Sequence, residues 1–219
     1  MAASSLPALT SVEARVLGVL AEKQHTVPDT YPLSLNALVA GCNQKTSRDP
    51  VMEVSDAQAQ EALDSLRSMN LVIESSGSRV PRYSHNVERV LQVPVLSAAL
   101  LAVLMLRGPQ TPGELRINCD RLHKFTDISA VEGFLRELAA RPAGALVTEL
   151  ARQPGSRENR WSHLLCGTPA PEQRAAPAPA ASRSSENDEL AALRFRVEAL
   201  EARLAELQAL MSAMRMKAE

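Results

Sequence analysis

The sequence predicts a mainly α-helical protein with small β-hairpins (an α+β class), in which one domain plan is used twice. Residues 77–85 return as residues 155–163, with six of nine positions identical. A second echo, of residues 14–20 in residues 98–104, lies upstream in the same order. Such self-similarity at a fixed period is the signature of a repeated domain. Because 45% of the chain is hydrophobic but only three Phe, two Tyr and one Trp are present, the cores must be aliphatic, which suits packed helices.

In the first copy, apolar residues recur at helical spacing in three segments, each starting at a residue that can cap free backbone amides. These caps are Thr10, Ser34 and Ser55. A polar loop, residues 43–50, is expected between the second and third helices. Two strands, residues 71–74 and 80–85, flank a turn around Gly77 and form a hairpin.

The second copy repeats this order. Residues 95–106 form its first helix, Thr111 caps the second, and residues 127–140 form the third. The hairpin strands are residues 146–150 and 160–165. Three helices followed by a hairpin is the order of a winged helix, a variant of helix-turn-helix. The sequence therefore predicts two tandem winged-helix domains, residues 1–93 and 94–167.

The C-terminal part has a different composition. Residues 168–186 are rich in Pro, Ala and Ser and are expected to be a disordered linker. Residues 187–216 are expected to form a coiled-coil helix that makes a parallel homodimer, although a helix folded back on its own domain is the alternative. The predicted seam consists of Leu190, Leu193, Val197, Leu200, Leu204, Leu207, Met211 and Met214.

The charge distribution gives only weak support for nucleic-acid binding. The formal net charge is −1, and both third helices carry more acidic than basic residues. Cations that could contact DNA phosphates lie in the polar loop and on the hairpins. These candidates are Lys45, Arg48, Arg79, Arg82, Arg157 and Arg160.

Two alternatives remain open for these residues. Arg82 and Arg160 directly precede an aromatic residue, which slightly favours a structural role, in which the ring is buried and the arginine forms an ion pair. Residues 42–52 are either a binding loop or a loop that Asn43 and Asp49 cap and close.

No catalytic, metal or cofactor site is predicted. The three cysteines are widely spaced without a CxxC pair, and the four histidines have no repeated acidic partner. The longest apolar run, residues 95–106, is too short to span a bilayer, and no N-terminal signal is visible. We therefore expect a non-enzymatic cytoplasmic protein with no membrane partner.

Five segments resemble the YceH-like family of uncharacterised bacterial proteins. They are residues 13–18, 31–36, 42–45, 48–52 and 106–116. The resemblance covers roughly residues 9–167 and implies a tandem winged-helix fold with DNA binding or regulation by analogy. One departure is that residues 117–119 are Ile-Asn-Cys, where the family tends to continue with basic residues.

Three functions are thus compatible with the sequence. The first is regulator-like association with double-stranded DNA through the hairpins and the loop at residues 42–52. The second is a scaffold whose winged helices dock a protein partner. The third is a small-molecule sensor with its site in the cleft between the two domains.

Overall fold

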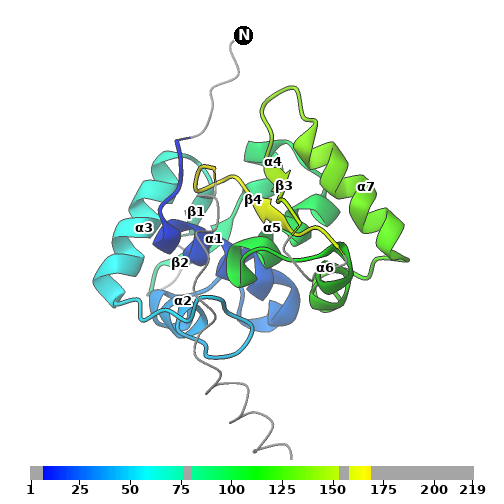
Figure 1. Cartoon of the computed structure of the whole chain (residues 1–219). Helices are drawn as coiled ribbons and strands as arrows, with labels where there is room; N and C mark the ends of the chain where they lie inside the picture. Colours follow the sequence, from blue (N-terminus) through cyan, green and yellow to red (C-terminus); the bar gives the residue numbers. More distant parts are fainter. Residues whose placement is uncertain (1–6, 76–79, 153–157, 169–219) are drawn as a thin grey trace, which may run out of the picture. The chain divides into compact units, whose positions relative to one another are not determined.

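The computed structural model describes residues 7–75, 80–152 and 158–168, which belong to one compact unit (Figure 1). The predicted coiled-coil helix with its heptad residues lies outside the described residues. So do Arg79 and Arg157.

The described part is mostly helical with two small antiparallel hairpins, as the sequence predicts. The first copy contains α1 (Ser11–Thr26), the 3-10 helix η1 (Pro28–Thr30), α2 (Leu35–Cys42), α3 (Asp56–Ser68), β1 (Val72–Ser75) and β2 (Arg82–His85). The short helix α4 (Val87–Leu91) follows, and then come α5 (Val95–Arg107), α6 (Pro112–Asn118), α7 (Ile128–Ala139), β3 (Val147–Glu149) and β4 (Trp161–His163).

The predicted helix starts are confirmed in atomic detail. The Thr10 hydroxyl accepts from the Glu13 amide at 3.2 Å, and the Glu13 carboxylate accepts from the Thr10 amide at 2.6 Å. The same reciprocal arrangement begins α3 at Ser55 and α6 at Thr111. These caps satisfy amides that lack a partner inside the helix, which is why they mark the helix starts so reliably.

The hairpins of the two copies have the same surroundings. In the first copy, Tyr83 and Leu33 exchange two backbone hydrogen bonds of 2.8 and 3.0 Å. In the second, Trp161 and Gln110 exchange two bonds of 2.7 and 3.0 Å. Both aromatic rings are buried, with 3% and 7% of the residue exposed. The sequence echo therefore marks a repeated piece of structure.

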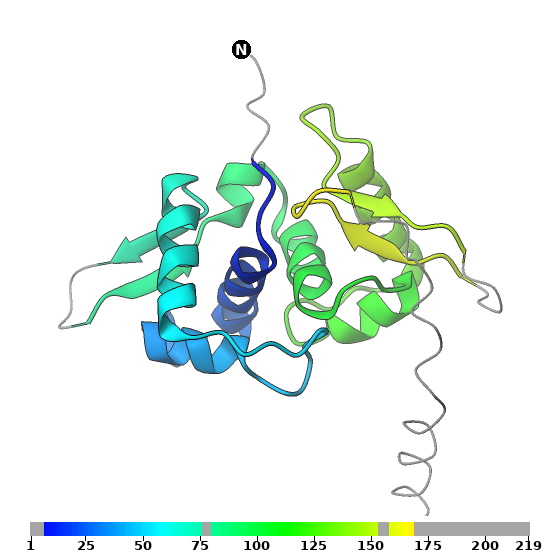
Figure 2. The ribbon, with the colours of Figure 1, turned by 60° about the vertical axis from the view of Figure 1, so that its left-hand side comes forward.

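The two copies share one hydrophobic core. Helices α1 and α5 pack side by side between the two hairpins, which extend to opposite sides in Figure 2. Gly18 permits this close approach, because a Cβ atom there would lie 3.0 Å from Leu106 Cγ. Backbone hydrogen bonds also join the copies, from Leu9 to Leu165 and from Asp49 to Leu106.

Candidate functional site

Arg48 is not the exposed loop cation that the sequence analysis expects. Its side chain is 0% exposed and forms an ion pair with Glu22 at 2.6 Å. It also donates to the Gly41 and Ser47 carbonyls, at 3.1 and 2.8 Å, and to Gln44 Oε1 at 2.8 Å. Its predicted role as a phosphate contact is corrected accordingly, since a guanidinium enclosed in this way is not on the surface.

The reason lies at the end of α2. The last carbonyls of a helix have no partner within it and need donors from elsewhere. Arg15 donates to the Cys42 carbonyl at 3.3 Å and to the Pro50 carbonyl at 2.6 Å, while Arg48 serves Gly41. Asn43 closes the loop by exchanging hydrogen bonds with the Val54 backbone at 2.7 and 2.9 Å. Asn43 therefore closes the loop at residues 42–52, as the second of the two alternatives expects.

The arginines before the hairpin aromatics are both engaged. Arg82 is exposed, but its guanidinium donates to the Thr30 and Pro32 carbonyls at 3.2 and 2.8 Å. Arg160 is 38% exposed at its side chain and lies 3.7 Å from Glu114. Both aromatic rings are buried, as the structural alternative expects, but only Arg160 has the expected ion pair, whereas backbone carbonyls hold Arg82. Lys45 is exposed and makes no ion pair within the described part of the chain.

Acidic residues cover the third helices. On α3, Asp56, Glu61 and Asp64 are exposed, and Arg67 is already paired with Asp64 and with Glu74, at 3.3 and 2.8 Å. On α7, Arg136 is paired with Glu132 at 2.8 Å. Carboxylates repel phosphates, so neither helix offers an unopposed cationic face to a DNA groove.

A concave surface lies between α7 and the second hairpin. We call it the helix–hairpin groove, and it encloses about 410 Å³. Its lining residues are Pro112, Ile128, Glu132, Arg136, Glu149, Arg152, Glu158, Asn159 and Trp161.

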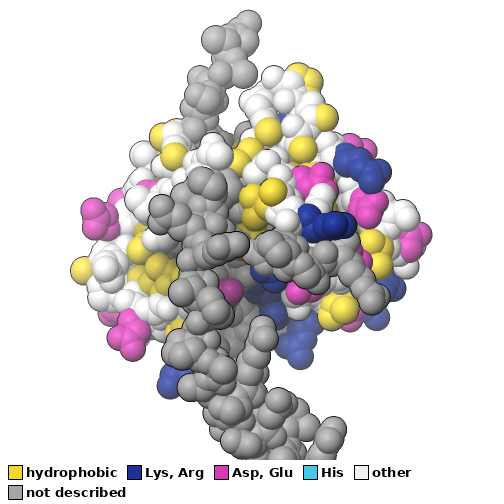
Figure 3. All heavy atoms as spheres, viewed as in Figure 1, with side chains coloured by type: hydrophobic (Ala, Val, Ile, Leu, Met, Phe, Trp, Pro, Cys, Tyr) yellow, Lys and Arg dark blue, Asp and Glu magenta, His cyan; other side chains and the backbone are white. Residues whose placement is uncertain are grey.

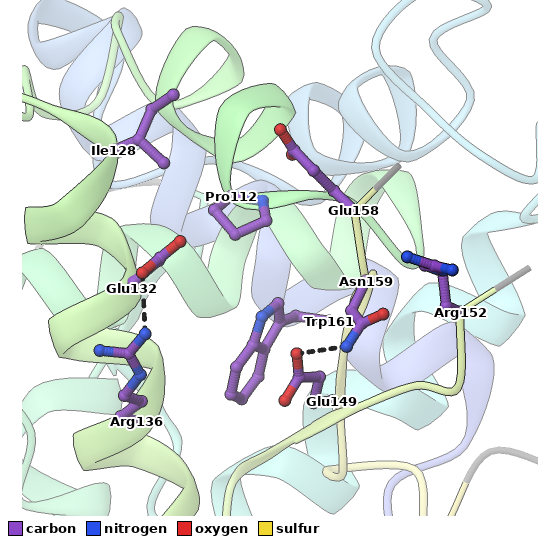
Figure 4. A pocket seen from close by; sticks show the side chains of 9 residues that line it. All are labelled: Pro112, Ile128, Glu132, Arg136, Glu149, Arg152, Glu158, Asn159 and Trp161. Carbon is purple, nitrogen blue, oxygen red and sulfur yellow. Dashed lines mark hydrogen bonds and ion pairs between the residues drawn. The ribbon is translucent and has the colours of Figure 1, made fainter. Parts of the chain in front are cut away.

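Figure 4 shows how this groove is assembled. Ile128, Glu132 and Arg136 project from α7 on one side, and the Trp161 indole lies on the hairpin side. Glu149 accepts a hydrogen bond from Asn159 Nδ2 at 2.8 Å, and Ile128 is 42% exposed. Three carboxylates thus surround an aromatic ring and an exposed aliphatic side chain, with two guanidiniums at the edges.

A larger hollow lies between the two copies. We call it the inter-repeat groove, and it encloses about 640 Å³. It is lined by the end of α1, the loop after α2, the end of α5, and the end of α6 with the turn that follows. A cleft between the two copies is where the small-molecule hypothesis expects a site, and the lining of this groove is largely polar. Its charged members are Glu22, Lys23, Arg107, Asp120 and Arg121.

Burial disfavours the charged forms of the core cysteines and of His85 and His163. Burial raises the pKa of the Cys42 and Cys119 thiols to about 12, so neither is an activated nucleophile. Burial lowers the pKa of His163 to about 4, and its Nδ1 has no hydrogen-bond partner. Burial also lowers the pKa of His85, whose Nε2 contacts Gln24 Oε1. Within the described ranges, no group of three or more His, Cys, Asp or Glu residues could hold a metal ion.

These features define a protein of two repeated helix–hairpin modules with polar grooves at their margins. Residues 9–156 match the family model described as "Protein of unknown function, DUF480", and the chain belongs to this family. It is 61% identical over 209 residues to a UPF0502 protein of Dechloromonas aromatica, covering 95% of this chain and 97% of the relative.

Other relatives have the same family name. A UPF0502 protein of Burkholderia pseudomallei is 58% identical over 211 residues, covering 96% of this chain and 89% of the relative. One of Burkholderia ambifaria is 65% identical over 163 residues, covering 74% and 69%. The expected membership of an uncharacterised bacterial family is confirmed, and the relatives carry the name UPF0502. No helix in the described segments is long and apolar enough to cross a membrane.

Proposed function

We propose that this protein is a non-enzymatic, regulator-like scaffold of two tandem winged-helix domains that a C-terminal coiled coil joins into a homodimer. The element order supports the winged-helix interpretation, since each copy has three helices, a hairpin, and a residue before the second helix that pairs with the hairpin. The unbroken heptad spacing in residues 187–216 supports the dimer.

The activity that the geometry supports best is docking of a protein partner in the helix–hairpin groove. The observation that carries this proposal is the lining of that groove. The exposed Ile128 offers apolar contact beside the largely buried Trp161 ring, and interfaces concentrate binding energy on apolar anchors of this kind. The three carboxylates outnumber the two guanidiniums, so a DNA phosphate would be repelled there.

The matching occupant is a partner segment that carries a basic side chain next to an apolar one. Glu132 is already neutralised by Arg136, which leaves the Glu149 side of the groove as the acidic wall. A lysine or arginine seated there would pair with Glu149 while its neighbour packs on Ile128. Charge complementarity of this kind favours specificity and fast association.

Site-specific photo-crosslinking tests this proposal. A crosslinkable residue at position 128 should capture one defined partner in living cells. The charge reversal Glu149→Lys should abolish that product, whereas the matched reversal Glu61→Lys on α3 should leave it intact. An equal loss in both variants, or no defined product, would count against docking in this groove.

Double-stranded DNA is the second candidate. It is favoured by Lys45, which is exposed and unpaired in the described structure, and by the Lys and Arg side chains that gather below α6 in Figure 3. This proposal predicts salt-sensitive binding to a labelled duplex that weakens when Arg79 and Arg157 become alanine. No change in fluorescence anisotropy at low salt, at roughly tens of micromolar protein, would exclude it.

A further inference from the structure

The inter-repeat groove has the dimensions of a small-ligand site. Its volume of about 640 Å³ lies within the range of small-molecule pockets, roughly 300–1,000 Å³. Five side chains with hydroxyl or amide groups line it, namely Thr26, Gln44, Thr46, Ser47 and Asn118. Ile117, which is 72% exposed, adds an apolar surface.

The groove is built from equivalent parts of both copies. Lys23 and Arg107 both lie in the last turn of the first helix of their copy, separated by the 84 residues that relate the helix echo. Arg107 reaches across the groove, and its guanidinium donates to Ser47 Oγ of the other copy at 2.6 Å. A ligand bound here would therefore contact both copies at once.

Positive charge is in excess around the groove. Lys23, Arg107 and Arg121 line it against the acidic Glu22 and Asp120, which leaves one positive charge in excess among the lining side chains. Glu22 is held by Arg48 at 2.6 Å and also lies 3.5 Å from Lys23 Nζ, which donates to Gln44 Oε1 at 3.3 Å. Arg121 is exposed and makes no hydrogen bond or ion pair with any described residue.

Helix ends provide a competing explanation for these cations. Helices α1, α2, α5 and α6 all end beside the groove, and helix C-termini carry partial negative charge that basic residues offset. The carbonyls that end α2, however, already receive hydrogen bonds from the buried Arg15 and Arg48. Arg121 lies three residues beyond the end of α6 and serves no carbonyl.

We propose that the inter-repeat groove binds a small organic anion that carries phosphate groups, held by Arg121, Arg107 and Lys23. Charge-assisted hydrogen bonds from guanidinium to phosphate are the strongest recognition that these side chains can offer. The apolar Ile117 would contact the organic part of the ligand.

Isothermal titration of the full-length protein with inorganic pyrophosphate and with AMP tests this site. Saturable binding to at least one probe, with a Kd of roughly millimolar or tighter, is expected. Arg121→Gln should weaken it about tenfold or more. The matched control is Arg116→Gln, which removes an exposed arginine of α6 that does not line the groove. It should leave the Kd unchanged.

Asp120→Asn provides a second, independent readout. Removing this carboxylate from the lining should tighten binding, whereas loss of a merely structural residue would not. Absence of saturable binding, or equal weakening by Arg121→Gln and Arg116→Gln, would overturn the proposal. Displacement of pyrophosphate by a DNA duplex would also overturn it, because the groove would then be a nucleic-acid contact.

Discussion

Replacing Arg48 by alanine is the sharpest test of the structural role assigned to the loop at residues 42–52. The side chain is fully enclosed and contacts Glu22, Gln44 and two carbonyls at 2.6–3.1 Å. Its removal would leave the Glu22 carboxylate, whose side chain is only 14% exposed, without its main counter-charge. Breaking a buried ion pair from one side costs about 3–5 kcal/mol, which is a large part of a typical stability of about 5–15 kcal/mol.

Urea unfolding followed by tryptophan fluorescence measures this effect. Trp161 is the only tryptophan, and its ring packs from strand β4 into the shared core, so its emission reports on that core. Lys45→Ala removes an exposed cation from the same loop and should change the free energy of unfolding by less than about 0.5 kcal/mol. A loss below about 1 kcal/mol for Arg48→Ala would refute the reasoning, since it would mean that the enclosed contacts add little to stability.

Three further outcomes are expected. Burial lowers the pKa of His163 from 6.5 in the unfolded chain to about 4 in the folded protein. Between these values the unfolded chain binds a proton at His163 and the folded protein does not, so the free energy of unfolding should fall by roughly 3 kcal/mol as the pH drops from 6.5 to 4. His163→Leu should remove that part of the pH dependence in urea unfolding. Gly41→Ala should destabilise by about 1–3 kcal/mol, since the new Cβ would lie 2.6 Å from Val19 Cγ1, and adding Val19→Ala should reduce the penalty. Leu200→Glu in the heptad seam should convert a dimer into a monomer in light scattering, and an unchanged mass would exclude the coiled-coil dimer.

Local chemistry accounts for what the sequence predicted well. A capping box needs only residues three apart, so Thr10 and Thr111 were identifiable as helix starts without any tertiary information. The repeated hairpin sequence likewise contains the buried aromatic residue of each copy, Tyr83 and Trp161. Helix α4 was missed because five residues are too few to show a helical period.

Tertiary contact accounts for what the sequence could not show. Arg48 sits among polar residues, a context that indicates an exposed loop, yet its main partner Glu22 lies 26 residues away on α1. The two grooves likewise draw their walls from elements far apart in the chain. The sequence does contain one indication of these equivalent positions. A cysteine stands at the end of the second helix in both copies, as Cys42 and Cys119, and both are buried. Aligning these two positions would have brought Gln44 and Arg121 into register.

Aligning Cys42 with Cys119 shows which equivalent positions carry different side chains in the two copies. A side chain that differs at an equivalent position of the two copies can serve a different purpose in each. In the first copy, Gln44 in the turn after the second helix also lines the inter-repeat groove, but its side-chain oxygen accepts a hydrogen bond from the buried Arg48. In the second copy, the equivalent Arg121 is exposed to the groove. The helix–hairpin groove also belongs to the second copy, so we expect substitutions there to impair binding and those in the first copy's turn to impair stability.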